Sequence, residues 1–437
     1  MYLKELEKIS AHHCPCGRAH TLSVDRILCG AGVVSQLPGI VKSYHAQKPY
    51  ILADKNTAAA GARVYELLRE SGIPYAAHTY DDAHLEPNET NVGLAFMYFP
   101  ADCDLVIGVG SGVINDIGKI VSAVSGRPYI IVGTAPSMDG YASASSSMTR
   151  EGLKISLPSR SANVIVGDTD ILCKAPLKLM RAGLGDMLAK YVSICEWRIS
   201  HLVTGEYYCE AIADLIRGAL KRCIDGADAL LRRDPEAVGA VFEGLVIGGL
   251  AMNYAGLSRP ASGIEHYFSH VWDMRGAAFG TPVELHGLQC AVGTLISVRL
   301  YEKLKTIVPD REKALRYAAD FDLDAWQAQL RAFLGKGAES MIALERKEHK
   351  YDKEAHKARL DVILRNWDGI LRIIEEELPP SAELEALLTR IGAPRTPEEI
   401  GIDKAILPMT FRAAKDIRDK YVLPRLAWDL GVLEELL

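Results

Sequence analysis

The sequence lacks a surplus of either charge: 50 Lys and Arg stand against 56 Asp and Glu, which gives a net charge of −6. Nucleic acids and acidic membranes attract clustered basic surfaces, so neither is expected as a partner. No apolar run approaches the roughly 18 residues that cross a bilayer. The N-terminal segment MYLKELEKISAHHCPCG also lacks the apolar stretch of a signal peptide. We therefore expect no nucleic-acid partner and no membrane insertion.

Cysteine is scarce. The nine cysteines are an odd number, and Cys29, Cys195, Cys209 and Cys290 lie in apolar runs. This usage is typical of reduced thiols and argues against a disulfide scaffold. With 49% hydrophobic and 24% charged residues, the composition also excludes a disordered or collagen-like chain. We expect a cytoplasmic, globular protein.

The two parts of the chain differ in pattern. Up to about residue 173, short β-rich runs alternate with helical stretches such as Thr57–Ser71 and Ile114–Val124. The expected strands are Pro49–Ala53, Cys103–Val109, Tyr129–Val132 and Ala162–Val166. This alternation predicts an α/β domain over residues 1–173, with a mostly parallel, Rossmann-like sheet and helices on both faces. Residues 174–437 read as an all-helical domain, with helical stretches at Ala175–Ser200, Glu206–Leu231, Asp234–Asn253 and Glu354–Glu377.

A glycine-rich turn follows the second expected strand. Glycines at Gly108, Gly110 and Gly112 let the backbone approach a phosphate, and the following helix N-terminus offers free N–H groups. Val113 stands where the dinucleotide fingerprint G-x-G-x-x-G requires glycine, and no Gly-Lys-Ser/Thr of a P-loop follows. The run fits either an anion cradle or a tight strand–helix turn.

Two further segments stand at the carboxyl ends of expected strands. An acid such as Asp54 can bind the ribose hydroxyls of NAD(H) and repel a 2′-phosphate, so it favours NADH while leaving NADPH open. A helix cap is an equal alternative for Asp54. The polar loop Thr134–Ser143 stands where α/β folds bind ligands, although its composition also suits a plain surface loop.

Histidines mark a candidate metal site. Ser262 and Glu265 predict a capping-box start of a helix that carries His266 and His270 four residues apart on one face. A third histidine, His286, begins another apolar helix. Spacing alone favours His266 and His270 as the ligand pair.

An acidic residue joins these histidines in the prediction. Asp186 and Lys190 are placed on one helical face, with Asp186 between apolar neighbours, where a carboxylate without a partner is costly. Imidazoles and a carboxylate with one open position suit a catalytic Zn²⁺-type site. A satisfied core histidine is the alternative for each residue taken alone.

A second cluster lies near the N-terminus, with His12, His13, Cys14, Cys16 and His20 inside nine residues. Thiolates and imidazoles this close could hold a second metal ion. A reduced surface loop is the alternative, because four ligands within nine residues demand a very tight loop.

Five strings occur in order along the chain: GVGSGVINDIGK, TAPSMDGYASA, GLGDMLAK, SRPASGIEHYFSH and ELHG. Together they closely resemble the sn-glycerol-1-phosphate dehydrogenase family, in particular its bacterial, arabinose-operon-type branch. That family shares a superfamily with iron-containing alcohol dehydrogenases, glycerol dehydrogenase and 3-dehydroquinate synthase. The matching motifs run from about residue 50 to 293. The resemblance implies the two-domain, dehydroquinate synthase-like fold.

The resemblance also implies an activity and a set of site residues. The family reversibly reduces dihydroxyacetone phosphate to sn-glycerol 1-phosphate with NADH or NADPH, for lipid-precursor synthesis. The implied metal ligands are Asp186, His266 and His286, whereas His270 faces the substrate as the proton relay, contrary to the spacing argument. Asp139, like Asp186, contacts the substrate. The implied cofactor contacts are Gly110, Ser111, Gly112, Val113, Ile114, Asn115, Asp116, Thr134, Ala135, Pro136, Ser137 and Ser143.

Several alternatives stay open. The metal is expected to be Zn²⁺, but Ni²⁺ and Fe²⁺ suit the same ligands. Lys190, Arg259 and Lys154 are candidate partners of the substrate phosphate, and a homo-oligomer is expected. Rival functions are a glycerol or polyol dehydrogenase for an unphosphorylated substrate, a carbocyclic sugar-phosphate synthase, and a catalytically dead nucleotide-binding regulator. The complete Asp186, His266 and His286 set argues against the regulator.

Overall fold

The computed structural model describes residues 14–437, apart from residues 22, 83–84, 152 and 282. The chain divides into two compact units. The first contains the residues up to Met187 together with Ala211–Leu257, and the second contains Leu188–Glu210 together with Ser258–Leu437. Residues 211–257 thus pack with the strand-rich part of the chain, although their composition is helical. A boundary after residue 173 stays a prediction.

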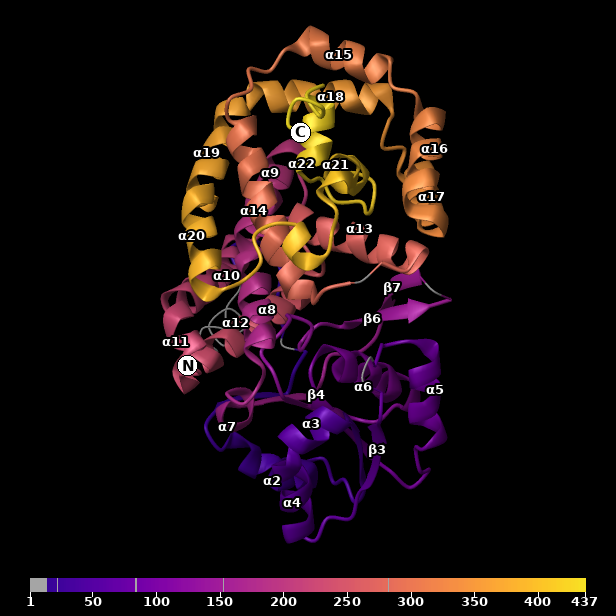
Figure 1. Cartoon of the computed structure of the whole chain (residues 1–437), viewed down its shortest axis with the longest axis vertical. Coiled ribbons are helices and arrows are strands. Elements are labelled where there is room, and N and C mark those ends of the chain that lie inside the picture. Colours follow the sequence, from indigo (N-terminus) through magenta and orange to yellow (C-terminus); the bar gives the residue numbers. More distant parts are fainter. Residues whose placement is uncertain (1–13, 22, 83–84, 152, 282) are drawn as a thin grey trace. The chain divides into compact units, whose positions relative to one another are not determined.

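The first unit is built on a parallel sheet (Figure 1). Within the described residues it has six strands in the order β1–β8–β5–β4–β2–β3, and β6 and β7 form a separate antiparallel hairpin. The strands are β1 (Arg26–Gly30), β2 (Pro49–Asp54), β3 (Ala76–Tyr80), β4 (Leu105–Gly110), β5 (Tyr129–Gly133), β6 (Ser145–Arg150), β7 (Leu153–Pro158) and β8 (Val164–Asp168). The predicted α/β sheet is confirmed.

Helices cover both faces of this sheet. On one face, α2 (Leu37–Ser43) and α4 (Ala62–Glu70) pack against alternate strand residues such as Ile51, Val109 and Val132. On the other face lies α6 (Gly112–Ser125), which packs on β4. There the Tyr129 ring fills the space beside Gly118, where an added Cβ would lie 2.5 Å from the Tyr129 hydroxyl oxygen. The two-sided burial explains why the central strands are apolar throughout.

Among the remaining helices of the first unit, one that the sequence predicts as continuous is divided in two. The helix predicted over Thr57–Ser71 is divided at Gly61, where an added Cβ would lie 2.3 Å from Cγ1 of Val109. The other helices here are α3 (Lys55–Ala60), α5 (Glu89–Met97), α7 (Thr169–Leu172), α8 (Leu177–Leu188), α10 (Glu210–Asp225), α11 (Ala227–Leu231) and α12 (Pro235–Ala255).

One helix corrects the expectation that no segment is apolar enough to cross a bilayer. Among the described residues, α12 has 21 residues with a mean hydropathy of 1.4 over its most apolar window. That window is 89% buried inside the protein. Its Phe242 ring packs on the sheet, since a Cβ added at Gly167 would lie 2.3 Å from that ring. The apolar composition of α12 thus reflects a core position.

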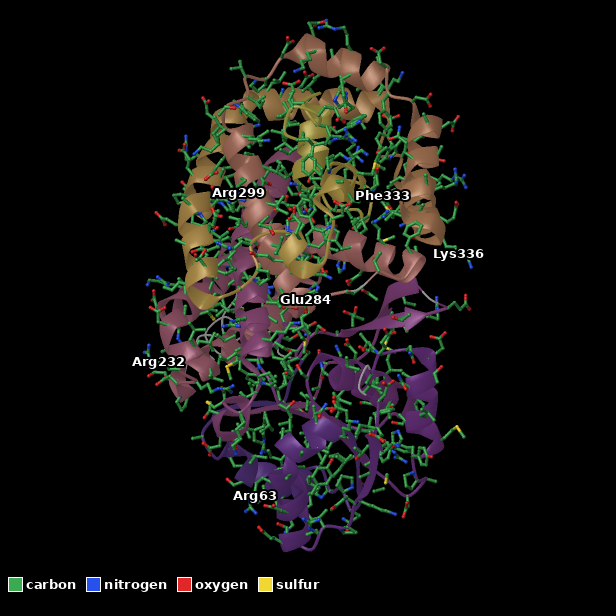
Figure 2. The ribbon with its side chains drawn as sticks, in the orientation of Figure 1. Arg63, Arg232, Glu284, Arg299, Phe333 and Lys336 are labelled. Atoms are coloured by element: carbon green, nitrogen blue, oxygen red, sulfur yellow. The ribbon has the colours of Figure 1, made fainter. Side chains whose placement is uncertain are left out.

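The second unit is helical, as the sequence predicts. Its helices are α9 (Lys190–Thr204), α13 (Ile264–Phe279), α14 (His286–Leu304), α15 (Arg311–Ala319), α16 (Leu323–Leu334), α17 (Ala338–Glu348), α18 (Lys353–Arg365), α19 (Trp367–Glu377), α20 (Ser381–Ile391), α21 (Leu407–Ala414) and α22 (Leu423–Asp429). Charged side chains lie on exposed faces, such as Arg299 on α14, which pairs with Glu385 at 2.7 Å (Figure 2). Pairs of this kind contribute little to stability.

Candidate active site

The strand order of the sheet reverses between β2 and β4. β2 pairs with β3 on one side and with β4 on the other, so the chain changes direction between β2 and β4. Ligands of open α/β sheets bind at the carboxyl ends of the strands at such a point. Asp54 ends β2, Gly110 ends β4, and the Thr134–Ser143 loop follows β5. The predicted nucleotide-binding segments therefore share one edge.

The glycine-rich turn leads into an open helix N-terminus. α6 begins at Gly112, and the Ser111 hydroxyl does not cap it. That hydroxyl lies 2.5 Å from Oγ of Ser137 and 3.0 Å from the Tyr141 hydroxyl, so it joins the turn to the loop after β5. The uncapped N–H groups of α6 are suited to a phosphate.

A buried lysine holds the loop after β5. Lys119 on α6 is fully buried and forms an ion pair with Asp116 at 3.0 Å. Its Nζ donates to the carbonyl oxygens of Gly140 and Ser145 at 3.2 and 2.5 Å and to Oγ of Ser143 at 3.1 Å. Lys119, which sequence reasoning did not single out as a site residue, thus orders the predicted cofactor segments. Its position in the string GVGSGVINDIGK was the available signal.

Asp54 acts as a helix cap in the structure. Its Oδ1 accepts hydrogen bonds from the backbone N–H groups of Asn56 and Thr57 at 2.8 and 2.9 Å, in a capping box at the start of α3. The alternative interpretation of Asp54 as a cap is therefore confirmed. Both bonds use one oxygen, and a role toward a ribose stays a prediction.

The loop after β5 also reaches the predicted metal ligand Asp186. The backbone N–H of Asp139 donates to Oδ2 of Asp186 at 2.9 Å. Two helices approach this loop closely through glycine: an added Cβ would lie 1.9 Å from the Pro136 carbonyl oxygen at Gly183 and 2.8 Å from the Asp139 carbonyl oxygen at Gly249. The loop is therefore fixed by close backbone packing beside a buried carboxylate.

The predicted metal ligands come together with one further residue. Asp186, His266, His286 and Cys290 each offer a ligand atom, and these atoms lie within 4.8 Å of one another. Asp186 is fully buried and His266 is 5% exposed. Asp186 lies in the last turn of α8. His286 is the first residue of α14, and the sequence predicts this helix start. The group has the donor types of a transition-metal site.

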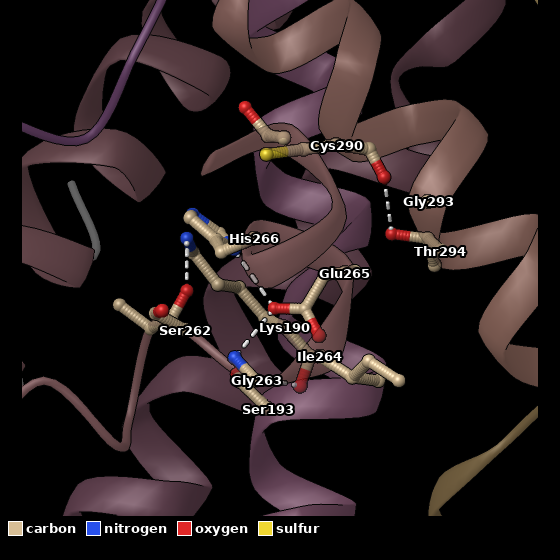
Figure 3. Close-up of polar contacts among 12 residues, drawn as sticks. Lys190, Ser193, Ser262, Gly263, Ile264, Glu265, His266, Cys290, Gly293 and Thr294 are labelled. Atoms are coloured by element: carbon tan, nitrogen blue, oxygen red, sulfur yellow. Dashed lines mark hydrogen bonds and ion pairs between the residues drawn. The ribbon is translucent and has the colours of Figure 1, made fainter. Parts of the chain in front are cut away.

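A carboxylate orients His266. Its Nδ1 lies 2.8 Å from Oε1 of Glu265, and since a carboxylate only accepts, Nδ1 carries the proton (Figure 3). The other nitrogen, Nε2, then keeps its lone pair for a metal, an arrangement common at metal-bound histidines. The same Glu265 oxygen accepts from the Gly263 N–H at 2.7 Å. Sequence reasoning assigned Glu265 only to a capping box.

The prediction that Ser262 caps this helix is wrong. α13 begins at Ile264, its N-cap is Gly263, and no side chain caps it among the described residues. The single helix expected to carry both Asp186 and Lys190 is divided at Ala189, which separates α8 from α9. Lys190 is buried and its Nζ donates to the Ala261 carbonyl oxygen at 3.0 Å.

His286 is oriented by a chain of hydrogen bonds. The Ser269 hydroxyl donates to Oε1 of Gln289 at 2.6 Å and therefore accepts from Nδ1 of His286 at 2.9 Å. Gln289 is anchored in turn, because its Nε2 donates to Asp273 at 3.1 Å. Nε2 of His286 is left facing Cys290, 3.5 Å from Sγ. In both histidines Nδ1 is thus hydrogen-bonded, and Nε2 is the ring nitrogen suited to a metal.

Cys290 is the residue of this group that sequence reasoning missed as a ligand. It follows His286 by four residues on α14, and this spacing was the available signal. Burial by itself raises the pKa of the Cys290 thiol, but the imidazoles of His266 and His286 outweigh burial, and the net pKa is lowered. A lowered pKa favours the thiolate form that binds metals.

His270 lies beside the metal group but is not part of it. Its ring centroid is 6.5 Å from that of His266 and 6.1 Å from that of His286, against which it stacks. Its placement suits the role implied by the resemblance better than the ligand role that spacing alone favours.

The basic residues that are candidates for binding the substrate phosphate differ in the protein groups that they already contact. Arg259 is buried, pairs with Glu206 at 2.8 Å and donates to the Tyr421 carbonyl oxygen at 2.7 Å. Lys420, in the part of the chain without motifs, donates from Nζ to the Ser262 carbonyl oxygen at 2.7 Å. Burial and the nearby guanidinium groups lower the pKa of Lys420 to about 7. Lys420 is therefore a basic group near the start of α13 that no sequence motif indicated.

The comparisons with known proteins agree with this architecture. Residues 28–176 match the family model of the iron-containing alcohol dehydrogenases. The crystal structure of maleylacetate reductase from Rhizobium sp. has a TM-score of 0.61 at 15% identity, covering 95% of this chain and 96% of that chain. At that identity the likeness shows the fold alone.

The similarity to curated relatives indicates a narrower family than the fold does. A glycerol-1-phosphate dehydrogenase [NAD(P)+] from Bacillus licheniformis is 29% identical over 429 residues, 97% of this chain and 94% of the relative. The enzyme of the same name from Bacillus velezensis is 31% identical over 324 residues, 72% of this chain and 81% of the relative. Together with the shared fold and the assembled donor set, this similarity shows that the chain belongs to the glycerol-1-phosphate dehydrogenase family, a branch of the iron-containing alcohol dehydrogenase type.

Proposed function

We propose that this enzyme catalyses the reversible, NAD(P)H-dependent and metal-assisted reduction of dihydroxyacetone phosphate to sn-glycerol 1-phosphate. The observation that carries the proposal is the convergence of Asp186, His266 and His286, in which Nδ1 of each imidazole already has a hydrogen-bond partner. The names of the curated relatives supply the substrate.

The residues present fit both groups that this activity needs. Two imidazoles with fixed tautomers, a carboxylate and a thiol suit a divalent ion of the Zn²⁺, Ni²⁺ or Fe²⁺ class, and we propose Zn²⁺ in the first place. The open N-terminus of α6 suits the cofactor's pyrophosphate, and Asp54 at the end of β2 favours NADH. When bound, the ion supplies Lewis-acid polarisation of the carbonyl and the nicotinamide supplies the hydride.

The chain's own residues supply positioning and the proton. Asp139, tied through its N–H to Asp186, is proposed to bind a substrate hydroxyl. His270, stacked against His286, is proposed to deliver a proton to the alkoxide oxygen as the general acid. Lys420 is the proposed partner of the substrate phosphate, because its Nζ lies at the Ser262 carbonyl near the start of α13, while Arg259 is already paired with Glu206.

NADH oxidation by metal-reconstituted enzyme, with dihydroxyacetone phosphate as substrate, tests this proposal. The activity is expected to disappear on chelation and in His266→Ala, and to return on metal addition only in the wild type. Lys420→Met is expected to raise KM for the phosphorylated ketone with a smaller change in kcat. Bound NADH without turnover under all metal conditions would instead favour a regulator or a synthase.

Three further inferences concern the oligomeric state, the compartment and the domain boundaries. We infer a homo-oligomer in the cytoplasm, with a nucleotide-binding domain over residues 1–173 and a metal- and substrate-binding domain over 174–437. Light scattering measures the oligomeric state, and fractionation of cells tests the cytoplasmic location.

A further inference from the structure

A second group of potential metal-ligating side chains shares no residue with the candidate active site. Cys14, Cys16, His20 and Cys209 each offer one ligand atom, and these four atoms lie within 4.8 Å of one another. His20 and Cys209 are buried, whereas Cys14 and Cys16 are half-buried. The other two members of the predicted N-terminal cluster, residues 12 and 13, lie outside the described residues. The fourth ligand, Cys209, comes from a segment that is far from residues 14–20 in the sequence.

A tight turn brings the first three ligands together. The Gly17 N–H donates to the Cys14 carbonyl oxygen at 2.9 Å, and Gly17 has a φ of +80°. Glycine adopts this left-handed conformation without the strain that a side chain would cause. The turn lets the chain double back, so that Sγ of Cys16 lies 3.4 Å from Nε2 of His20. Because Cys209 is the fourth residue, the short loop needs to supply only three ligands.

The tautomer of His20 suits metal binding. Nδ1 of His20 lies 3.2 Å from the Tyr254 carbonyl oxygen, which can only accept, so Nδ1 carries the proton. The lone pair on Nε2 therefore faces Cys16. The neighbouring Arg18 donates to the Ala255 carbonyl oxygen at 3.4 Å. The loop is thereby anchored on the last turn of α12, and the backbone carbonyl orients His20 as in many metal sites.

Cys209 directly precedes α10. It is the second-last residue of the segment Leu188–Glu210 of the second unit, and the rest of α10, from Ala211 on, belongs to the same unit as Cys14, Cys16 and His20. Cys209 is 1% exposed. All nine cysteines are free thiols in the structure, so no disulfide accounts for the gathering of three sulfur atoms.

The donor set is that of a structural zinc site. Three thiolates and one imidazole close a tetrahedral shell, whereas the active-site group contains a carboxylate. Ligand atoms at about 2.3 Å from Zn²⁺ lie roughly 3.5–4 Å apart, so the observed spread requires only a small contraction. We propose that Cys14, Cys16, His20 and Cys209 bind a second divalent cation, Zn²⁺, which fastens the 14–20 loop to the start of α10. Binding releases the thiol protons to solvent.

Metal analysis of the full-length protein tests the proposal. The wild type is expected to hold one metal ion per chain more than Cys16→Ser and Cys14→Ser variants, which place serine at half-exposed positions and should fold. His266→Ala should lose the active-site ion and retain the other. Cys173→Ser is the matched control, because Cys173 is also half-buried but belongs to neither group; its metal content should not change.

Cobalt substitution gives a readout independent of activity. Co²⁺ in a Cys₃His site produces strong thiolate-to-cobalt charge transfer and intense tetrahedral d–d bands. We expect these bands in His266→Ala, and their loss in Cys14→Ser and Cys16→Ser together with a lower Tm. A wild type that holds one ion which His266→Ala removes, or cysteine variants with unchanged metal content and cobalt spectra, would overturn the proposal.

Discussion

At the scale of single residues, Glu265 determines how His266 presents itself to a metal. Its carboxylate accepts hydrogen bonds from Nδ1–H of His266 and from the Gly263 N–H. We predict that Glu265→Gln, which weakens this acceptor, lowers metal affinity about tenfold or more. Metal titration of the apoprotein measures it. Glu377→Gln, at another buried acid that pairs with Arg198, is the control, and equal affinity in the two variants would contradict the role of Glu265.

His270 provides the second prediction at this scale. As a proton donor outside the ligand group, it should be dispensable for metal binding but not for turnover. We predict that His270→Ala keeps its active-site ion while kcat falls by about 10²–10⁴-fold. Metal analysis and steady-state kinetics on one preparation test both parts. Loss of the ion would instead support the His266–His270 pair that spacing alone favours.

At the scale of secondary-structure elements, glycine permits α8 to approach the loop after β5. A Cβ added at Gly183 would lie 1.9 Å from the Pro136 carbonyl oxygen, and both groups are backbone-fixed. We predict that Gly183→Ala costs about 1–3 kcal/mol of stability and weakens NADH binding, because the cofactor loop must shift. Urea unfolding and NADH titration measure these effects.

The matched control for this prediction is Gly39→Ala on α2. Nothing lies within 4 Å of a Cβ added at Gly39, so alanine there should be neutral or stabilise by up to about 1 kcal/mol. If both variants unfold at the same urea concentration and bind NADH equally, close packing at Gly183 is not what positions the loop.

The elements also show what the sequence could predict. The buried strands β2, β4, β5 and β8 were predicted because both of their faces are apolar, whereas β1 and β3 were missed. These two lie at the edges of the sheet, and β3 alternates between covered and exposed residues, so its short pattern carries little apolar signal. The helix break at Gly61 coincides with close packing, because a Cβ added there would lie 2.3 Å from Cγ1 of Val109.

The site was predictable to a similar degree. Local motifs and family resemblance pointed to Asp186, His266 and His286, which the structure brings together. Cys290 and Cys209 were read only as apolar-run thiols, because their ligand partners are supplied by folding. Lys119 and Lys420 were missed for the same reason: each acts through backbone carbonyls that the chain folds around it.

At the scale of the whole molecule, a buried charge cluster should control acid stability. Asp416 accepts from Arg425 and Trp326, each at 2.8 Å, and pairs with Lys415 at 3.1 Å. Burial would raise the pKa of Asp416, but Lys415, Arg425 and Lys350 outweigh it and lower the pKa from 3.8 to about 2. Because the folded pKa is depressed, the carboxylate stabilises the fold above pH 4, and this contribution of about 2 kcal/mol is lost as the pH falls toward 2.

We predict that Asp416→Asn destabilises the protein at pH 7 by about 3–5 kcal/mol, because buried cations lose their counter-charge, and flattens the acid limb of its stability profile. Urea unfolding across the pH range measures both. Asp214→Asn, at an exposed pair with Arg217, should leave the profile close to that of the wild type. An unchanged acid limb in Asp416→Asn would contradict this account of the cluster.

The central claim is that this fold reduces a phosphorylated ketone at the Asp186, His266 and His286 site. The most direct test is NADH oxidation by the metal-reconstituted enzyme with dihydroxyacetone phosphate and dihydroxyacetone side by side. We predict a strong preference for the phosphorylated ketone that chelation abolishes, with sn-glycerol 1-phosphate as the product. Equal or faster turnover of unphosphorylated dihydroxyacetone would contradict the claim and favour a glycerol dehydrogenase.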